Sequence, residues 1–552
     1  MTISQKRWLY ALWLISIGGF ALLHALHLSA DFPNHTRWFF DWAKYTDEGW
    51  YGSAGMRAHL LGNWYLAGDL NTAAAVPAWP FAEWVLYFFT GVSIEAARGL
   101  AVAFFFCNLG LSYLLLRVSG ARWMALLALT LIVTSPFLYC FSRLAILEPM
   151  LTASTLAAMN LAVRLPRMRR PVAASVAIGL LFMLMGLTKT TAVFLLPALG
   201  WAMLRPLWHN RRLAARCALA ASGTVAAAGG LWMALLIHTG MLDEARYFFA
   251  INKYPKPPVF YWPLLSLWQM IEAALPVDHI LIPLAGVVLA AILVVILAKC
   301  APSLALAQGN SGVRSSFGGW NQWARGLLAD PVFGASVLAV AGYILFMTYQ
   351  NHQQPRYFAV VAFFSFFVVA RGAGSLLGQT GSENGFRPGH LGWFVLLAAA
   401  LAAAFNGLQT LNYAAHPEYT FVEAARRLTQ YIDTHPNGNR LLVSSSGDEI
   451  SLITHLPALC DDYGMLDLPS RLARYQPGWF ASWNDIDSGT LQDIHTRFSL
   501  EQVASFRAFD DPNRNVLVLF KLHPLPGGQV RDINEQDLQV PLPGDKFQVD
   551  VE

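Results

Sequence analysis

Apolar runs of membrane-spanning length recur along most of the chain, and they constrain its fold more than any other feature. A helix needs about 20 apolar residues to cross the hydrocarbon core of a bilayer, and such runs recur from the N-terminus to about Gln409. Of the 552 residues, 55% are hydrophobic and only 13% are charged, whereas a soluble protein carries about 25% charged residues. The composition therefore predicts a polytopic α-helical membrane protein.

Hydropathy predicts about eleven transmembrane helices. The predicted spans are 8–28, 98–116, 123–140, 149–163, 172–187, 190–204, 214–237, 280–298, 331–348, 357–370 and 391–410. The first run follows Lys6 and Arg7 and lacks a small-residue cleavage site, so we expect an uncleaved first helix and not a signal peptide.

The loops between the predicted spans differ in positive charge, and this difference predicts their orientation. Short cytoplasmic loops are enriched in Lys and Arg. The loops that carry these residues contain Arg117, Arg122, Arg164, Arg167, Arg169, Arg170, Arg205, Arg211, Arg212, Arg216, Lys299, Arg314, Arg325, Arg371 and Arg387. The opposite loops are about 29–97, 141–148, 188–190, 238–279 and 349–356. We expect these, with the C-terminus, on the periplasmic side of a bacterial inner membrane.

The first outer loop is rich in aromatic residues. Its stretches Trp50–Leu66 and Phe81–Phe89 are amphipathic, which is typical of helices that lie in the membrane interface. The loop is therefore expected to form a ledge along the membrane surface.

After Tyr413 the sequence becomes that of a soluble domain. Glu423–Ile432 predicts an amphipathic helix, and Leu441–Ser444 and Val516–Leu522 predict strands. Gly527–Glu552 is polar and rich in Pro and Gly, as in a loosely ordered tail. We therefore divide the chain into a transmembrane domain, 1–410, and a periplasmic soluble α/β domain, 411–552.

Charge and cysteine spacing exclude several classes of function. The formal net charge of +4 is small and dispersed, without a basic stripe interleaved with aromatic residues, so no nucleic-acid partner is expected. The five cysteines have no paired spacing typical of a zinc site or a disulfide framework, although Cys140 and Cys460 both fall near the outer side. The fourteen histidines form no HExxH motif.

Ionisable residues gather at the span ends that the orientation places outside. Charged side chains near hydrocarbon are costly and need solvent or a partner. The residues in this set are Asp47, Glu48, Arg143, Glu148, Lys189 and Arg356. Each has a simpler explanation alone: Lys189 as an interfacial anchor, Arg143 and Glu148 as a local pair, and the adjacent acids as the first turn of a helix. Together, they predict a functional cluster at the outer membrane surface.

Several of these residues lie in motifs that resemble those of C-class membrane glycosyltransferases. The resemblance is to the protein O-mannosyltransferase and lipid A aminoarabinose transferase group, over roughly residues 1–410. The matching segments are Asp47-Glu48-Gly49-Trp50-Tyr51, Gly62-Asn63-Trp64-Tyr65, Pro77–Trp84, Arg143–Pro149, Gly186–Pro197 and Pro355-Arg356-Tyr357. Glu148 departs from the pattern, because many members of the group carry Asp there.

The resemblance implies an inverting glycosyltransferase, which moves a sugar from a polyprenyl-phosphate-linked donor to an acceptor hydroxyl. A long prenyl chain stays in the bilayer, because each buried CH₂ contributes about 0.8 kcal/mol. The phosphate must therefore be met at the membrane surface, where the charged cluster is expected.

Roles for the cluster follow from this chemistry. A single displacement requires a base for the acceptor proton. The resemblance points to Asp47 for this role, because it is the first residue of the acidic pair in the matching motif, with Glu48 supporting the acceptor or the surroundings of the base. Cations must stabilise the phosphate. The candidates are Lys189, Arg143 and Arg356. The candidates for contact with sugar or acceptor are Glu148, Tyr51, Trp50 and Trp64, although interfacial anchoring also explains such aromatic residues.

Other functions also fit the sequence. A lipid or lipid-linked glycan flippase also has many spans with a few charges, but transporters usually hold ionisable residues near the bilayer midplane. An O-antigen-type polymerase or ligase would use similar donors. Asp47, Glu48 and Glu148 could hold Mg²⁺ or Mn²⁺. Ser444–Glu449 and Asp461–Tyr463 could contact an acceptor, although ordinary turn chemistry also explains them.

Overall fold

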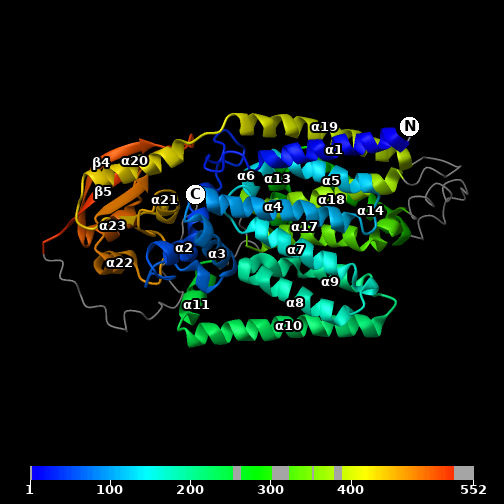
Figure 1. Cartoon of the computed structure of the whole chain (residues 1–552), viewed down its shortest axis with the longest axis horizontal. Coiled ribbons are helices and arrows are strands. Elements are labelled where there is room, and N and C mark those ends of the chain that lie inside the picture. Colours follow the sequence, from blue (N-terminus) through cyan, green and yellow to red (C-terminus); the bar gives the residue numbers. More distant parts are fainter. Residues whose placement is uncertain (1–2, 253–262, 301–322, 351–352, 378–387, 527–552) are drawn as a thin grey trace, which may run out of the picture.

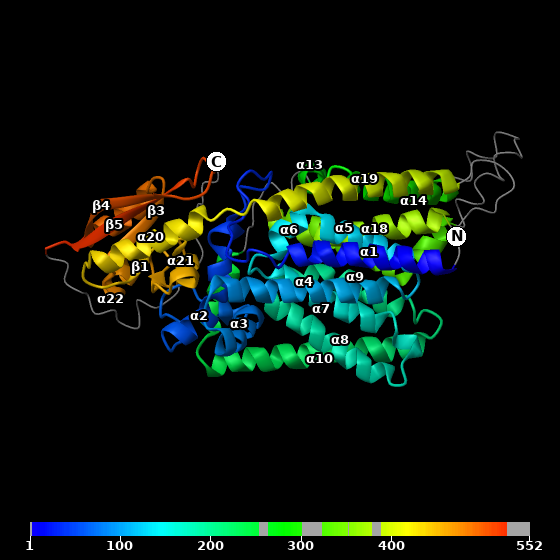
Figure 2. The ribbon, with the colours of Figure 1, turned by 45° about the horizontal axis from the view of Figure 1, so that its top comes forward.

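The chain forms an elongated helical bundle with a smaller α/β domain at one end (Figure 1). The computed structural model describes residues 3–252, 263–300, 323–350, 353–377 and 388–526. The expected tail, Gly527–Glu552, and the cytoplasmic candidates Arg314 and Arg387 lie outside these residues. The two views agree that the bundle helices run roughly along the long axis of the molecule (Figures 1 and 2).

The helices of the bundle coincide with the apolar runs of the sequence. They are α1 (Ile3–Leu23), α4 (Ile94–Leu116), α5 (Arg122–Thr134), α6 (Pro136–Ser142), α7 (Glu148–Ala162), α8 (Pro171–Thr188), α9 (Leu196–Leu204), α10 (Arg211–His238), α14 (Leu281–Cys300), α17 (Pro331–Gln350), α18 (Phe358–Leu377) and α19 (Pro388–Ala415). Short 3-10 turns flank three of them, at η3 (Leu165–Arg167), η4 (Thr190–Leu195) and η6 (Pro355–Tyr357).

Six of the described helices are long and apolar enough to cross a membrane, or seven if a bent pair counts as one span. The further apolar segments Arg7–Leu23, Thr190–Leu204, Leu264–Val277 and Leu281–Leu297 are shorter. A polytopic helical architecture is thus present, and the count of about eleven spans stays a prediction.

The predicted span 123–140 is not one straight helix. It is broken at Ser135, where α5 and α6 meet at 69°. Ser135 precedes Pro136 and is extended (φ −67°, ψ 116°), as expected because the proline ring disfavours the helical region for the residue before it. The Ser135 side chain then caps α6 by accepting from the Leu138 amide.

Short helices cover the end of the bundle next to the α/β domain. From the first outer loop come η1 (Trp42–Lys44), α2 (Asp47–Leu60), η2 (Thr72–Ala74) and α3 (Ala78–Thr90), and from a later loop come α11 (Leu242–Ile251), α13 (Pro263–Ala274) and η5 (Leu275–Val277). Helices α2 and α3 form where the sequence predicted amphipathic stretches.

The C-terminal domain is built on a mixed sheet of five strands in the order β2-β1-β3-β5-β4. Strand β1 pairs in parallel with β2 and β3, and β5 pairs antiparallel with β3 and β4. The strands are β1 (Leu442–Val443), β2 (Ala458–Leu459), β3 (Trp479–Trp483), β4 (Phe498–Arg507) and β5 (Val516–Pro524), and the helices are α20 (Thr420–Thr434), α21 (Gly447–Thr454), α22 (Leu468–Tyr475) and α23 (Ser488–His495). The predicted C-terminal sheet is confirmed.

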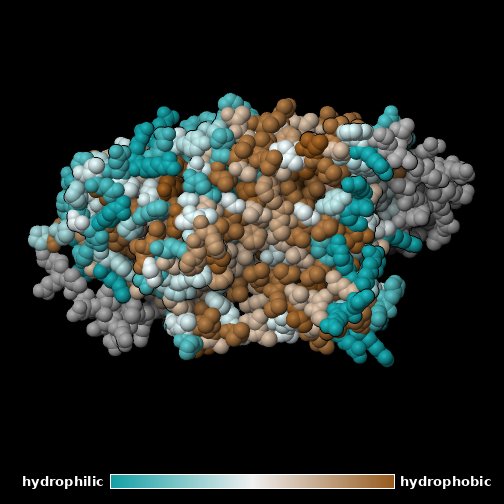
Figure 3. Space-filling model, in the orientation of Figure 1, coloured by the Kyte–Doolittle hydropathy of each residue, from teal (hydrophilic) through white to brown (hydrophobic). Residues whose placement is uncertain are grey.

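The surface of the bundle matches a lipid environment. Hydrophobic residues cover the middle of the visible face, and hydrophilic residues gather over the C-terminal domain and at the opposite end (Figure 3). Helix α18 is almost wholly buried at the centre, whereas α10 buries only Cys217 and Leu236. An apolar helix with so much exposed apolar surface is stable only if another apolar phase, such as lipid, covers it.

Candidate functional site

Asp47 and Arg356 meet at the end of the bundle that carries the C-terminal domain. Asp47 is the first residue of α2, and Arg356 lies in η6, immediately before α18. The Arg356 Nε atom is 2.8 Å from Asp47 Oδ2, and both residues are buried. A charge removed from water needs such a partner, because desolvation of an isolated ion is costly.

Arg356 is also held by Asp41. Its Nη1 donates to Asp41 Oδ1 at 2.7 Å and its backbone amide donates to Asp41 Oδ2 at 2.8 Å. Its guanidinium lies 5.0 Å from the centre of the Tyr357 ring. The same ring lies 4.5 Å from Lys189 Nζ, so Tyr357 stands beside both cations.

Lys189 and Glu148 form the second ion pair of the cluster. Lys189 Nζ donates to Glu148 Oε1, and both residues are buried. Lys189 interrupts the helical path between α8 and η4 with an extended backbone, and Glu148 is the first residue of α7. Arg143 and Glu148 therefore do not pair with each other, which was the simpler explanation from the sequence.

The surroundings of Asp47 favour a carboxylate that can accept a proton near neutral pH. Burial raises the pKa of Asp47 to about 6, and the nearby charges of Asp41 and Glu148 act in the same direction. Arg356 and Lys189 oppose this shift. One electrostatic cluster thus contains Asp47, Glu148, Lys189 and Arg356. The raised pKa of Asp47 within it is suited to a general base.

Glu48 points to a different partner. Its carboxylate receives Arg98 Nε at 2.8 Å and Arg98 Nη2 at 2.6 Å, a bidentate arrangement, and also the Ala145 amide at 2.7 Å. Arg98 in turn donates to the carbonyls of Leu28 and Ala30. Glu48 therefore connects α2, to which it belongs, with α4 and with the loop between α6 and α7.

Arg143 lies apart from the two ion pairs. Its Nη2 donates to the carbonyls of Leu26 at 2.6 Å and His27 at 2.5 Å, and its Nη1 donates to the Tyr139 hydroxyl. The guanidinium lies 4.6 Å from the centre of the Tyr139 ring. Arg143 thus connects the segment that follows α1 to α6.

The three candidate aromatic residues have different neighbours. Tyr51 is a neighbour of the cluster, because the charges of Asp47 and Arg356 act on its hydroxyl. Trp50 faces the C-terminal domain: its Nε1 donates to the Ser445 carbonyl at 3.1 Å and its ring makes an edge contact with Tyr463. Trp64 packs against Trp84.

The C-terminal domain is fastened to the outer loop by a buried ionic network. Arg57 of α2 pairs with Asp448 of α21 at 2.9 Å and with Asp69 at 2.7 Å. Asp69 also receives Arg471 of α22 at 3.2 Å. All four residues are buried. Elsewhere, Lys44 pairs with Asp511 at 2.6 Å.

The carboxylates do not converge as metal ligands would. Within the described ranges, no group of three or more His, Cys, Asp or Glu residues is arranged to hold a metal ion. Asp47 faces Arg356, Glu48 faces Arg98 and Glu148 faces Lys189. The three carboxylates considered for Mg²⁺ or Mn²⁺ thus each face a different cation, and a metal site stays a prediction. Cys140 and Cys460 are both free and buried.

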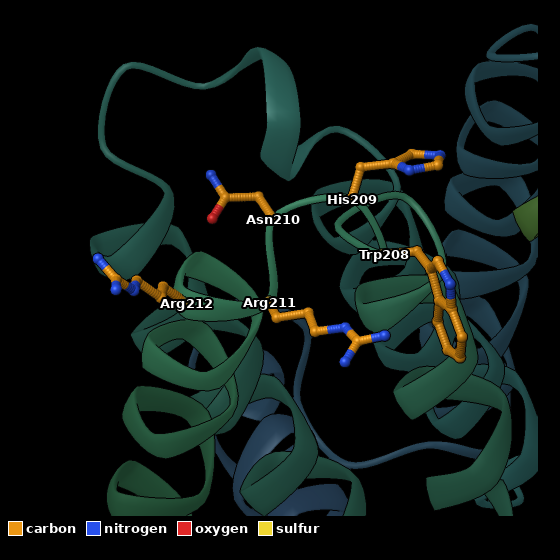
Figure 4. A pocket seen from close by; sticks show the side chains of 5 residues that line it. All are labelled: Trp208, His209, Asn210, Arg211 and Arg212. Carbon is orange, nitrogen blue, oxygen red and sulfur yellow. The ribbon is translucent and has the colours of Figure 1, made fainter.

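Hollows lie at different places in the described part of the bundle. A narrow cavity beside Glu148 is lined mainly by apolar side chains, with Phe105, Phe141 and Phe363 among them. The second hollow lies between α9 and α10, at the far end of the bundle from the C-terminal domain (Figures 1 and 4). It is lined by Trp208, His209, Asn210, Arg211 and Arg212.

Sequence reasoning assigned no role to three residues of the site region, although Tyr357 stands in one of the matching segments. Asp41 lies in the same aromatic loop as Asp47, Tyr357 follows Arg356 directly, and Arg98 begins an apolar run. An arginine at the start of an apolar run is a sign of a buried partner. Asp41 had no such sign, because it lies within a loop and not at the start of an apolar run. Its partner, Arg356, is far away in the sequence.

Comparison with solved structures identifies the fold. ArnT from Cupriavidus metallidurans matches with a TM-score of 0.56 and 15% identity in the apo state, and with a TM-score of 0.55 and 13% identity when bound to undecaprenyl phosphate. Both alignments cover 92% of this chain and 98% of ArnT. AglB from Archaeoglobus fulgidus, in complex with an inhibitory peptide and a dolichol-phosphate, matches with a TM-score of 0.48 and 13% identity, over 87% of this chain and 70% of AglB.

No family model and no curated protein sequence matches the chain. The two ArnT structures, in contrast, align over nearly the whole length of both chains. This chain therefore has the fold of the C-class membrane glycosyltransferases, as its sequence motifs predicted.

Proposed function

We propose that this protein is an inverting glycosyltransferase that uses a polyprenyl-phosphate-linked sugar and transfers it to an acceptor hydroxyl at the outer face of the inner membrane. The observation that carries the proposal is the buried Asp47 carboxylate beside Arg356, in one cluster with the Lys189–Glu148 pair. The cluster lies at the mouth of an apolar bundle, where a lipid-linked phosphate would meet the protein.

Asp47 acts as the base in this reaction. As the acceptor oxygen attacks the anomeric carbon, its proton passes to the Asp47 carboxylate. The bond between the anomeric carbon and the phosphate oxygen breaks, and its electron pair leaves with the polyprenyl phosphate. Because the attack comes opposite the leaving phosphate, the anomeric configuration inverts. A positioned base contributes about 10²–10⁴-fold to such a step.

Lys189 and Arg356 stabilise the departing phosphate. Fixed cations at a developing negative charge are effective because they need no reorganisation during the reaction. Asp41 and Glu148 orient these cations through their ion pairs. Glu148 also lines the narrow cavity with Phe105, Phe141 and Phe363, and we propose that the first isoprene units of the carrier enter the bundle there.

The acceptor reaches Asp47 from the side of the C-terminal domain. Trp50 already contacts that domain through Ser445 and Tyr463, and Tyr51 lies next to the cluster. These aromatic residues are suited to pack against the face of a sugar ring. In this proposal the C-terminal domain is periplasmic, on the same side as the cluster.

The decisive experiment measures release of free polyprenyl phosphate by the purified protein in lipid. A panel of polyprenyl-phosphate sugars is offered with candidate acceptors, and Asp47→Asn serves as the matched control because it keeps the shape of the side chain and removes its basicity. We expect release by the wild type and a loss of about 10²–10⁴-fold in kcat for the variant. Normal turnover by Asp47→Asn would remove Asp47 from the mechanism, and transport of intact donor without release would support a flippase instead.

A further inference from the structure

The helix that carries Asp47 lacks a side-chain cap of its own. The first amides of any α-helix have no partner within the helix, and a Ser, Thr, Asp or Asn before it usually supplies one. Thr46 stands at this place before α2 but makes no side-chain cap hydrogen bond. Its hydroxyl donates instead to the carbonyl of Trp42 at 3.0 Å.

A residue of the C-terminal domain supplies the missing acceptor. Glu449 Oε2 accepts from the Gly49 amide, in the first turn of α2, at 2.9 Å. Glu449 belongs to α21 and has a relative exposure of 0%. A carboxyl oxygen near a helix N-terminus satisfies an amide that has no partner within the helix.

The backbone geometry at Gly49 shows how closely α21 approaches α2. A Cβ atom at Gly49 would lie 2.3 Å from the backbone carbonyl carbon of Asp448 and 2.3 Å from the backbone nitrogen of Glu449. Only glycine leaves room for this approach. The start of α21 is therefore seated directly on the first turn of the helix that begins at Asp47.

Helix α21 is anchored to the outer loop at both of its ends. At the start of α21, Asp448 pairs with Arg57, in the last turn of α2, at 2.9 Å. Just after its end, His455 Nε2 forms a hydrogen bond of 2.8 Å with the Val92 carbonyl, in the loop after α3. With these contacts in place, Glu449 has a fixed position relative to α2.

We propose that Glu449 is a positioning residue: the C-terminal domain caps the first turn of α2 and thereby holds Asp47 at its place beside Arg356. This inference rests on the proposed function, because it matters for turnover only if Asp47 is the base. It assigns the C-terminal domain a role in catalysis that does not depend on contact with either substrate. Displacement of a reacting group by about 1 Å is enough to cost about 10²-fold in rate.

The charged groups around Glu449 decide which substitution is conservative. Its carboxyl group faces Glu48 and Arg98, and Glu83 and Tyr87 of α3 belong to the same acidic region. Burial, together with the charge of Glu48, raises the pKa of Glu449 well above its usual range. A neutral Gln keeps a carbonyl oxygen that accepts from Gly49 and therefore mimics the protonated acid, whereas Ala removes the acceptor.

The test compares Glu449→Ala, Glu449→Gln and His455→Asn in the full-length protein reconstituted in lipid. His455→Asn is the matched control, because it loosens the same helix at its other end without touching α2. The measurements are kcat, KM for the donor, and hydrogen exchange of the amides in residues 46–51. We expect Glu449→Ala to lower kcat about tenfold to a hundredfold, to leave KM nearly unchanged and to speed exchange at residues 46–51. Glu449→Gln should keep both near the wild-type values, and His455→Asn, which leaves the Glu449–Gly49 contact in place, should change both much less than Glu449→Ala does.

Two results would overturn the inference. The first is unchanged exchange at residues 46–51 in Glu449→Ala, which would mean that the cap does not hold α2. The second is equal impairment in Glu449→Ala and His455→Asn, which would reduce the role of Glu449 to general docking of the domain. The exchange measurement needs no turnover, so a wild-type protein that transfers no sugar would refute the proposed function and still leave the cap tested.

Discussion

Arg356 lies with its Nε atom 2.8 Å from Asp47 Oδ2, and this contact joins the start of α2 to the start of α18. The same guanidinium is held by Asp41 through Nη1. Because Arg356 has two carboxylate partners, its position survives when Asp47 takes up a proton. The arrangement therefore allows Asp47 to change its charge during a catalytic cycle without releasing the cation.

The first prediction concerns pH. Burial raises the pKa of Asp47 to about 6, and a base acts only when it is deprotonated. The value of kcat/KM should therefore rise about tenfold per pH unit below the pKa of the base and level off above pH 6. Lys189 lowers the pKa of Asp47, so Lys189→Ala should move the midpoint to higher pH. A midpoint that does not move would show that the titrating group is not Asp47.

The second prediction separates Lys189 from Arg143. Lys189 lies in the cluster with Asp47, whereas Arg143 donates to the carbonyls of Leu26 and His27. Lys189→Ala should lower kcat about 10²–10³-fold, as loss of other electrostatic stabilisers does. Arg143→Gln should mainly lower the thermal unfolding midpoint. Steady-state kinetics with a purified donor and a thermal melt distinguish the two, and equal kinetic losses would return Arg143 to the phosphate site.

The third prediction concerns the network that fastens the C-terminal domain. Arg57→Met removes the cation between Asp69 and Asp448 and leaves Asp448 without its ionic partner. Breaking a buried pair in this way typically costs about 3–5 kcal/mol. The double variant Arg57→Met/Asp448→Asn should recover part of the loss, because it also removes the buried charge. Thermal or denaturant unfolding in detergent measures both, and an additive result would contradict a direct coupling.

The fourth prediction concerns Gly49. Its Cβ position lies 2.3 Å from backbone atoms of α21, which cannot rotate away as a side chain can. Gly49→Ala should therefore force α21 and α2 apart, at a cost of about 1–3 kcal/mol or more. Limited proteolysis of the segment between α19 and α20 should become faster. Gly18→Ala is the control, because nothing lies within 4 Å of its Cβ position, and similar proteolysis of both variants would argue against the contact.

Much of the fold could be predicted from local sequence. Apolar runs specify helices in a bilayer because backbone groups in hydrocarbon must be satisfied within the segment, and each predicted span falls on a helix or a helix pair. The kink at Ser135 was encoded by Pro136 but missed, because hydropathy reports apolar length and not backbone direction. The motif resemblance predicted the fold that the ArnT structures share.

The site was predicted only as a set of residues. Asp47, Glu148, Lys189 and Arg356 could be singled out because a charge at the end of an apolar run is costly without a partner. Their pairing could not be read from the sequence. Arg143 was an equal candidate for the phosphate, and only the structure shows that it donates to carbonyls in the segment after α1.

The sequence by itself determined which segments are helical and which charged side chains need a partner. Both depend on the local cost of burying polar groups in an apolar phase. Tertiary structure decided that Asp47 faces Arg356, that Glu48 faces Arg98, and that Glu449 reaches α2. These choices depend on distances between segments far apart in the chain. An ion pair forms only where two backbones bring complementary charges within a few ångströms, and no local pattern records that approach.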